Sequence, residues 1–330
     1  MRGYITVTIC LFLIVMVFAA STAMVVGIFE LKVVTSSTQL NKNGDGLVIL
    51  FDMEDPEGDD YGPGTYFYPT HDFFKPHRGL FDMTRFVVSY DASTVYFDTT
   101  FKEVQNPLDA EEGFTHQLID IYISTGQEGG KTQTLRKGAY VEFDEKYPWN
   151  LYIRGGPWQL SRVYTAADDE MSKGISKGIR TELLPDGKTI RIAINKGLIG
   201  EPREGWKYYV LIGSQDGFGP DEYRPVMEKA TGWDFGGGRN DEFNPNVIDM
   251  LAASNGKYSQ EKMLLSFKPE EGKLAIISPV GPGGDYRVFS SLRTPHIIIT
   301  LLSLAAFIYI FRKTSIIRSI LGLLKRKKES

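Results

Sequence analysis

The stretch DGKTIRIAI, residues 186–194, joins a tight-turn dipeptide to a run in which every second residue is isoleucine. Asp-Gly favours hairpin turns, and alternation with period two is typical of a half-buried strand. Similar runs lie at residues 46–52, 85–90, 94–99, 117–123, 149–154 and 208–213. Many short strands between Gly, Pro and Asp turns predict an all-β fold, an antiparallel β-sandwich. Within this body we expect one helical turn, at residues 196–199.

The charge of the chain is unevenly distributed along its 330 residues. Residues 296–330 carry seven basic residues and one acidic residue, a net charge of +6. Without these residues and Arg2, the body has 29 basic and 40 acidic residues, a net charge of about −11. An acidic body argues against nucleic acid as a partner, because phosphates need a basic surface. The single cysteine, Cys10, excludes an intrachain disulfide.

Two apolar segments flank this body. Residues 1–23 are predicted to be a signal peptide, or an uncleaved anchor if they are retained. Residues 296–313 are predicted to be a transmembrane helix, and the basic tail, 314–330, favours a cytoplasmic C-terminus. A buried C-terminal helix is the alternative. We therefore expect an extracellular domain at 24–268, a stalk at 269–295 and a place in the cell membrane.

An acidic, Gly- and Pro-rich turn, DPEGDDYGPGTYFYP, occupies residues 55–69. Closely spaced aspartates in such a turn can direct several oxygens at one hard cation, and oxygen ligands favour Ca²⁺ over zinc or copper. The predicted metal ligands are Asp55, Asp59, Asp60 and Asp82. The alternative is that these aspartates cap turns through their own backbone. A second acidic group, at 216, 221 and 234, is a competing candidate.

Aromatic residues beside turns are candidate sugar contacts, because a sugar stacks its apolar face on a ring while its hydroxyls form hydrogen bonds. The candidate ligand-binding residues are Tyr61, Tyr66, Tyr68, Trp158 and Tyr223, with Gln215 and Asp216 as polar partners. Trp158 follows a Gly-Gly-Pro turn and is expected at the surface. Trp149 and Trp206 are expected in the core. The sequence shows no nucleophile constellation and no phosphate-binding loop, and we interpret the glycines at 236–238 as a tight turn.

The chain resembles the C-terminal module of glucodextranase, which also occurs in amylopullulanases and belongs to the DOMON-like group of β-sandwich domains. The resemblance runs in the family's order from about residue 46 to residue 268. It is carried by residues 55–69, 106–107, 113–114, 117–123, 213–220, 223–226, 233–238, 245–249 and 264–266.

The resemblance implies a β-sandwich that binds a ligand without catalysing a reaction, and its distribution implies an archaeal or thermophilic setting. Some DOMON-like domains bind haem through Met and His, and both Met53 and His116 occur here. A core Met and a structural His are the more ordinary roles, so we expect no haem.

The sequence therefore predicts a non-catalytic, membrane-anchored cell-surface protein whose sandwich binds a glycan or another cell-envelope polymer. One alternative is a structural surface-layer or envelope protein with no free sugar ligand. Another is an accessory subunit of a transporter or of a glycosidase encoded elsewhere.

Overall fold

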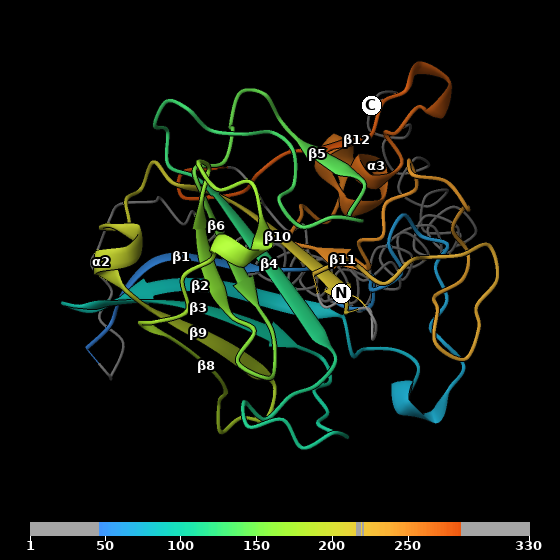
Figure 1. Ribbon diagram of the computed structural model, residues 1–330, viewed down its shortest axis with the longest axis horizontal. Helices are drawn as coiled ribbons and strands as arrows, with labels where there is room; N and C mark the ends of the chain where they lie inside the picture. The colour runs from blue at the N-terminus through green and yellow to red at the C-terminus, as the bar shows by residue number, and fades with distance from the viewer. Residues whose placement is uncertain (1–45, 216–218, 220, 285–330) are drawn as a thin grey trace, which may run out of the picture. The chain divides into compact units, whose positions relative to one another are not determined.

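The computed structural model describes residues 46–215, 219 and 221–284. Two five-stranded antiparallel sheets form the body (Figure 1). The first sheet has the order β1 (Val48–Glu54), β2 (Met83–Tyr90), β3 (Thr94–Phe101), β9 (Thr189–Asn195), β8 (Ile179–Leu183). The second has the order β11 (Asp249–Met250), β10 (Lys207–Ser214), β4 (Gln117–Ser124), β6 (Leu151–Gly155), β7 (Arg162–Thr165). The predicted antiparallel β-sandwich is confirmed.

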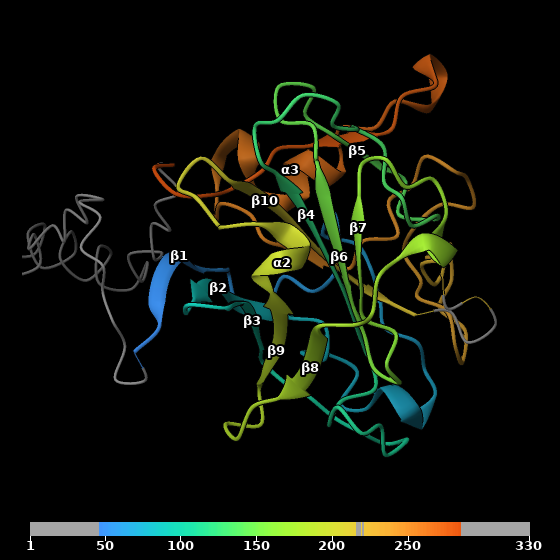
Figure 2. The same ribbon diagram turned by 60° about the vertical axis from the view of Figure 1, so that its left-hand side comes forward.

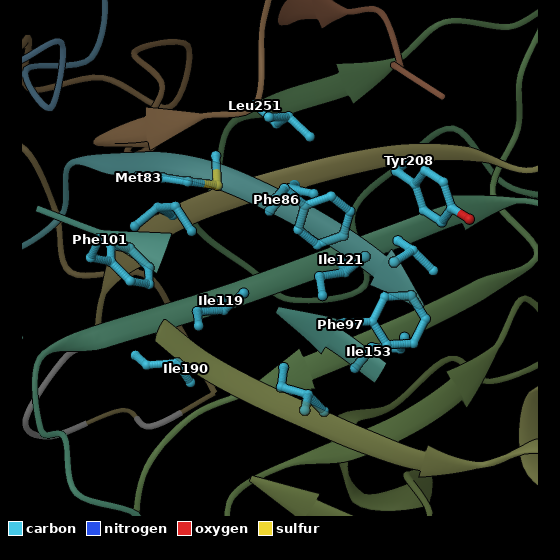
Figure 3. Packing of buried hydrophobic residues seen from close by; sticks show 14 of the residues in the cluster. Met83, Phe86, Phe97, Phe101, Ile119, Ile121, Ile153, Ile190, Tyr208 and Leu251 are labelled. Carbon is cyan, nitrogen blue, oxygen red and sulfur yellow. The ribbon is translucent and has the colours of Figure 1, made fainter. Parts of the chain in front are cut away.

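The main core lies between the two sheets. Phe86 and Phe97 from the first sheet meet Ile119, Ile121 and Ile153 from the second (Figure 3). These side chains alternate along their strands because successive residues of a strand point to opposite faces. The alternating patterns at residues 85–90 and 94–99 therefore place one apolar face of each strand in this core.

Strand β4 is buried at every position, which makes it the central strand of the fold. Its odd-numbered isoleucines enter the main core, while Leu118 and Tyr122 enter a second hydrophobic cluster on the other face. A strand covered on both faces is apolar along its whole length rather than alternating. This explains why residues 117–123 form an almost continuous apolar run.

A further layer covers the outer face of the second sheet (Figure 2). It contains the parallel pair β5 (Val141–Phe143) and β12 (Ala275–Ile277), the helix α3 (Gln260–Leu264) and the 3-10 turns η3 (Gly256–Tyr258) and η4 (Pro269–Glu271). Ala275 and Ile277 are buried, and Val280 forms a bridge to Tyr208 in β10. The folded body thus extends past residue 268, into the range predicted as a stalk.

The remaining helical pieces are short. They are α2 (Lys196–Ile199), η1 (Asp72–Phe74) and η2 (Met171–Lys173). The helical turn predicted at 196–199 is confirmed, and the Asn195 side chain caps it by accepting the Gly197 amide at 2.8 Å. In the described part of the chain, no helix has the length and apolar character needed to cross a membrane. The predicted signal segment, 1–23, and the predicted transmembrane helix, 296–313, lie outside that part.

Two long connections meet at one edge of the sandwich. Residues 55–82 join β1 to β2, and residues 215–248 join β10 to β11. Phe67 forms a bridge with Gly236, and Thr70 donates its amide to the Thr231 carbonyl at 2.9 Å. A Cβ at Gly236 would lie 2.1 Å from the Ala230 nitrogen, so this contact requires glycine. The glycines at 236–238 thus allow two chain segments to approach closely.

Candidate functional site

A pocket of about 770 Å³ opens beside the meeting point of the two long connections. We call it the tryptophan pocket, because Trp158 and Trp233 line it and are exposed to 41% and 47%. Polar lining residues include His116, Gln215, Arg224 and Asp234. A concave site with aromatic walls and a few polar groups is the usual form of a small-molecule site.

Trp233 is held by its neighbours on both sides. Its ring stacks on His71 at a centroid distance of 4.4 Å. Its amide donates to Thr231 Oγ1 at 3.1 Å, and its carbonyl accepts from Arg224 Nη1 at 2.9 Å. Trp233 was not among the binding residues predicted from the sequence. Its position in the turn Thr-Gly-Trp-Asp, residues 231–234, is the signal that could have identified it.

Trp158 lies on the turn after β6 and is at the surface, as its Gly-Gly-Pro context indicates. Trp158 and Gln159 both adopt positive φ angles, 55° and 56°. Their amides donate to the Glu112 carboxylate at 2.9 and 2.6 Å. A left-handed conformation at two consecutive non-glycine residues is costly, and these charge-assisted hydrogen bonds offset part of that cost.

Arg224 supplies a fixed positive charge to the pocket. Its guanidinium donates to Ser214 Oγ at 3.1 Å and to the Gln215 carbonyl at 2.7 Å, and it lies over the Phe74 ring. His116 is buried beside it, and neither ring nitrogen has a hydrogen-bond partner among the described residues. Burial and the charge of Arg224 lower the pKa of His116 to about 4. The imidazole is therefore neutral at pH 7.

The predicted tyrosines form a different, smaller pocket of about 350 Å³, which we call the tyrosine pocket. Tyr61 and Phe67 are exposed there, whereas Tyr66 is buried and donates its hydroxyl to the Pro245 carbonyl. Tyr68 donates to Asp60, and burial, reinforced by the negative charge of Asp60, raises the pKa of its phenol. Both hydroxyls are therefore committed to internal hydrogen bonds.

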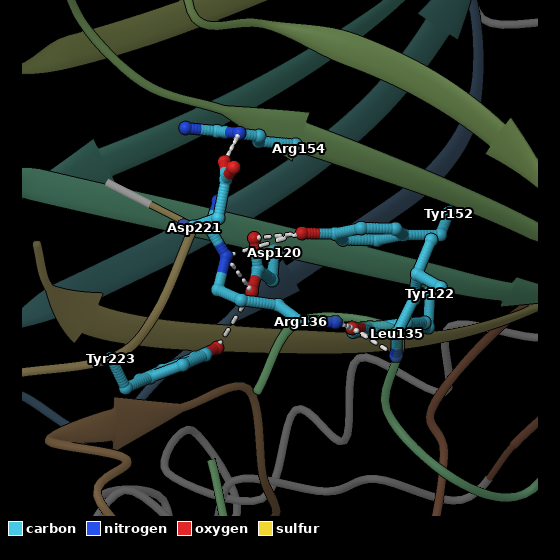
Figure 4. A network of polar contacts seen from close by, with 8 residues as sticks. All are labelled: Asp120, Tyr122, Leu135, Arg136, Tyr152, Arg154, Asp221 and Tyr223. Atoms are coloured by element: carbon cyan, nitrogen blue, oxygen red, sulfur yellow. Dashed lines mark hydrogen bonds and ion pairs between the residues drawn. The ribbon is translucent and has the colours of Figure 1, made fainter. Parts of the chain in front are cut away.

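Tyr223 is separated from both pockets. It is buried in the second hydrophobic cluster, and its hydroxyl donates to Asp120 at 2.9 Å. Asp120 also accepts from Tyr152 at 2.7 Å and pairs with Arg136 at 3.0 Å, and both charged side chains are fully buried (Figure 4). This network ties β4 and β6 to the segments around residues 136 and 223.

The sequence-predicted ligand residues thus separate into groups. Gln215 and Trp158 line the tryptophan pocket, and Tyr61, Tyr66 and Tyr68 line the tyrosine pocket. Asp216 lies outside the described residues. Of the competing acidic group, Asp221 pairs with Arg154, and Asp234 lines the tryptophan pocket. Met53, the candidate haem ligand, packs in the main core.

Three acidic side chains lie close together near the start of the 55–82 connection. Asp55, Asp59 and Asp249 each offer one ligand atom, and these atoms lie within 4.8 Å of one another. Asp249 was not predicted from the sequence. Asp60 is directed elsewhere and accepts the Gly79 amide at 2.6 Å, while both oxygens of Asp82 accept the Gly58 amide.

The carboxylates of this group destabilise one another's charged forms. Burial raises the pKa of Asp55 and of Asp249 well above the usual range for Asp, and neighbouring aspartates raise it further. Burial and the charge of Asp82 raise the pKa of Asp59 to about 7, and burial raises that of Asp82 to about 6. A positive charge at the centre of the group would reverse these shifts.

Comparison with known proteins gives one family match. The family model of the C-terminal binding module of glucodextranase, described as SLH-like, matches residues 50–279. A solved carbohydrate-binding module of family 9 from Caldicellulosiruptor kristjanssonii, in complex with cellotriose, is 12% identical, with a TM-score of 0.26. That match covers 62% of this chain and 77% of the other. None of the curated proteins matches this chain.

Proposed function

Because the chain belongs to the family of the C-terminal, SLH-like binding module of glucodextranase, we propose that its β-sandwich binds carbohydrate in the tryptophan pocket. The observation that carries the proposal is the pair of exposed tryptophans, Trp158 and Trp233, on the walls of one pocket. Indole rings offer the flat apolar surface on which a sugar ring stacks. A volume of about 770 Å³ is in the range of pockets that enclose a small ligand.

The polar groups of the pocket suit the hydroxyls of a neutral glycan. Arg224 and Gln215 lie on the wall, and their backbone and side-chain contacts hold them in place before a ligand arrives. Preformed donors and acceptors reduce the entropic cost of binding. The acidic surplus of the body, 40 acids against 29 bases, disfavours an anionic polymer.

We propose a binding role without catalysis for this pocket. Glycoside hydrolysis requires two carboxyl groups on opposite sides of the scissile bond. Among the described residues that line the pocket, Asp234 is the one carboxylate, and it accepts the Thr231 hydroxyl at 2.9 Å. This supports a module that holds a glycan rather than one that cleaves it.

The test is a glycan-array screen of the full chain in detergent, followed by calorimetry with the best ligand. Trp233→Ala and Trp158→Ala should each weaken binding about five- to tenfold, since an aromatic contact contributes about 1 kcal/mol. Tyr258→Ala is the matched control, because Tyr258 is equally exposed but does not line the pocket. The proposal fails if no glycan binds, or if both tryptophan variants bind like the parent.

The competing proposal is an assembly role at the cell envelope, as a surface-layer component or as a subunit of a transporter or glycosidase. Leu265 and Ile276, both half exposed, support it, because the Ile276 amide donates to Oγ of Ser266, the residue after Leu265. Exposed apolar side chains that cluster can mark a protein interface. Sedimentation that shows self-association, reduced by Ile276→Glu, together with an empty glycan array, would favour this role.

We also propose that the protein is anchored in the cell membrane with its sandwich outside. The contrast between the acidic body and the basic C-terminal tail supports this orientation. Protease added to intact cells should remove the body and leave a small basic fragment. Full protection of the body would contradict the orientation.

A further inference from the structure

The strongest site outside the two pockets is the group formed by Asp55, Asp59 and Asp249, which we call the carboxylate cluster. Asp55 follows the last residue of β1, Asp59 lies in the turn after it, and Asp249 opens β11. Their ligand atoms lie within 4.8 Å of one another. The cluster therefore joins the edge strand of one sheet to the edge strand of the other.

Two oxygens of this cluster lack a partner. Asp55 is only 6% exposed, and its Oδ1 accepts the Ala252 amide at 2.9 Å while its Oδ2 has no hydrogen-bond partner among the described residues. Asp59 Oδ1 is also buried and has no hydrogen-bond partner among the described residues. Native proteins rarely leave a buried polar atom unsatisfied, and a buried charge needs a counter-charge.

No side chain in the described part of the chain supplies that counter-charge through an ion pair. None of the ion pairs between described residues includes Asp55, Asp59 or Asp249. The amides of Met83 and Met250 satisfy part of Asp249, each at 2.7 Å, but an amide carries no net charge. The charged form of the cluster thus has no counter-charge among the described residues, and a bound cation would supply one.

The spacing of the ligand atoms fits one cation. Oxygens that bind Ca²⁺ at about 2.3–2.6 Å lie at most about 4.6–5.2 Å apart across the ion. The separation within the cluster, up to 4.8 Å, falls in this range. All donors are oxygens, which disfavours zinc and copper. We propose that Asp55, Asp59 and Asp249 bind one Ca²⁺ ion, with water completing its coordination.

The proposed ion would act as a clamp between the sheets. Asp55 belongs to the end of β1 and Asp249 pairs with Ile212 of β10 through the β11 register, so the ligands come from both halves of the sandwich. A cation bound only by the folded state stabilises that state by mass action. This role is independent of glycan binding, so either proposal can fail alone.

The test is calorimetric titration of Ca²⁺ into the full chain, purified in detergent and stripped of metal with chelator. We expect one site, and a melting temperature about 5–10 °C higher at a hundredfold excess of Ca²⁺ over its Kd than after chelation. A parallel titration with Mg²⁺ should give weaker binding, because Mg²⁺ demands octahedral geometry and keeps its waters. The absence of both heat and melting shift with Ca²⁺ would overturn the proposal.

Single substitutions test whether calcium binds at the carboxylate cluster rather than at acidic residues in general. Asp59→Asn and Asp249→Asn should lose the calcium response. Asp52→Asn should keep it, because Asp52 lies on β1 outside the cluster and pairs with Arg85 of β2 at the surface. Asp60→Asn should also keep it, since Asp60 points toward Gly79. Asp59→Asn removes a repelling charge, so it should melt no lower than the chelated parent. Unchanged calcium binding in Asp59→Asn and Asp249→Asn would refute the assignment.

Discussion

The buried pair of Asp120 and Arg136 allows a sharp prediction about stability. Both side chains are fully buried. Asp120 forms an ion pair with Arg136 Nε at 3.0 Å and accepts hydrogen bonds from Tyr152 at 2.7 Å and Tyr223 at 2.9 Å. Asp120→Asn preserves the shape but replaces one acceptor with an amide donor. It also leaves the Arg136 charge without its counter-ion. Breaking a buried pair in this way costs about 3–5 kcal/mol.

Urea unfolding of the full chain in detergent measures this loss. With a slope of about 2–3 kcal/mol per molar urea, the midpoint should fall by about 1–2 M. Asp52→Asn is the matched control, because Asp52 also pairs with an arginine, Arg85, through two hydrogen bonds, but at an exposed site. There the expected loss is below about 1 kcal/mol.

A double variant tests whether the loss comes from the pair itself. In Asp120→Asn with Arg136→Met no charge remains buried, so the double variant should be more stable than either single variant. The reasoning is refuted if Asp120→Asn costs less than about 1 kcal/mol, or if the effects of the two single variants simply add.

Three further predictions concern residues around the pockets. His116 has a pKa of about 4 when folded and near 6.5 when unfolded, so stability is full above pH 6.5 and declines as the pH falls toward 4. The loss between pH 7.5 and 5 should be about 2 kcal/mol greater in the parent than in His116→Gln, measured by urea unfolding at both pH values. Equal pH dependence would exclude this role. Tyr66→Phe removes the hydroxyl bonded to Pro245 and Asn244, and it should cost about 1–3 kcal/mol by the same assay. A loss below a few tenths would show that water replaces the hydroxyl. Gly236→Ala forces a Cβ against the Ala230 nitrogen and should weaken glycan binding by moving the Trp233 turn, whereas Gly205→Ala, with no neighbour within 4 Å, should not.

The sheets and the central strand could be predicted because their signals are local. Alternation at residues 188–194 and the Asp-Gly turn before it determine a strand without reference to the rest of the chain. The run at 117–123 was predicted as a strand, whereas its burial on both faces depends on the outer layer and was not predicted. Trp149 and Trp206 are buried as predicted. Each of the predicted features depends on a pattern within about eight residues.

The composition of the carboxylate cluster could not be predicted from local spacing. Asp60 is adjacent to Asp59 in sequence, yet in this irregular turn it is directed away from the cluster and accepts the Gly79 amide. Asp249 is far along the chain and is brought to the cluster by strand pairing between β10 and β11. The burial of Tyr223 could not be predicted from local spacing either, because an aromatic residue beside a turn can face either the solvent or the core.

The two long connections, 55–82 and 215–248, indicate where this molecule binds its ligands. β1 and β2 are antiparallel neighbours, which a hairpin loop of about 2–5 residues could join. Residues 55–82 intervene instead, and residues 215–248 similarly separate the paired strands β10 and β11. Long loops with little regular structure are uncommon in compact domains and are usually functional. Here they supply Asp55 and Asp59 of the carboxylate cluster, the tyrosine pocket and the Trp233 wall of the tryptophan pocket. Both connections also contribute to the main core, through Phe81 and Phe235 for example. The sandwich and the two connections therefore fold as one unit, in which the strands support the sites that the connections build.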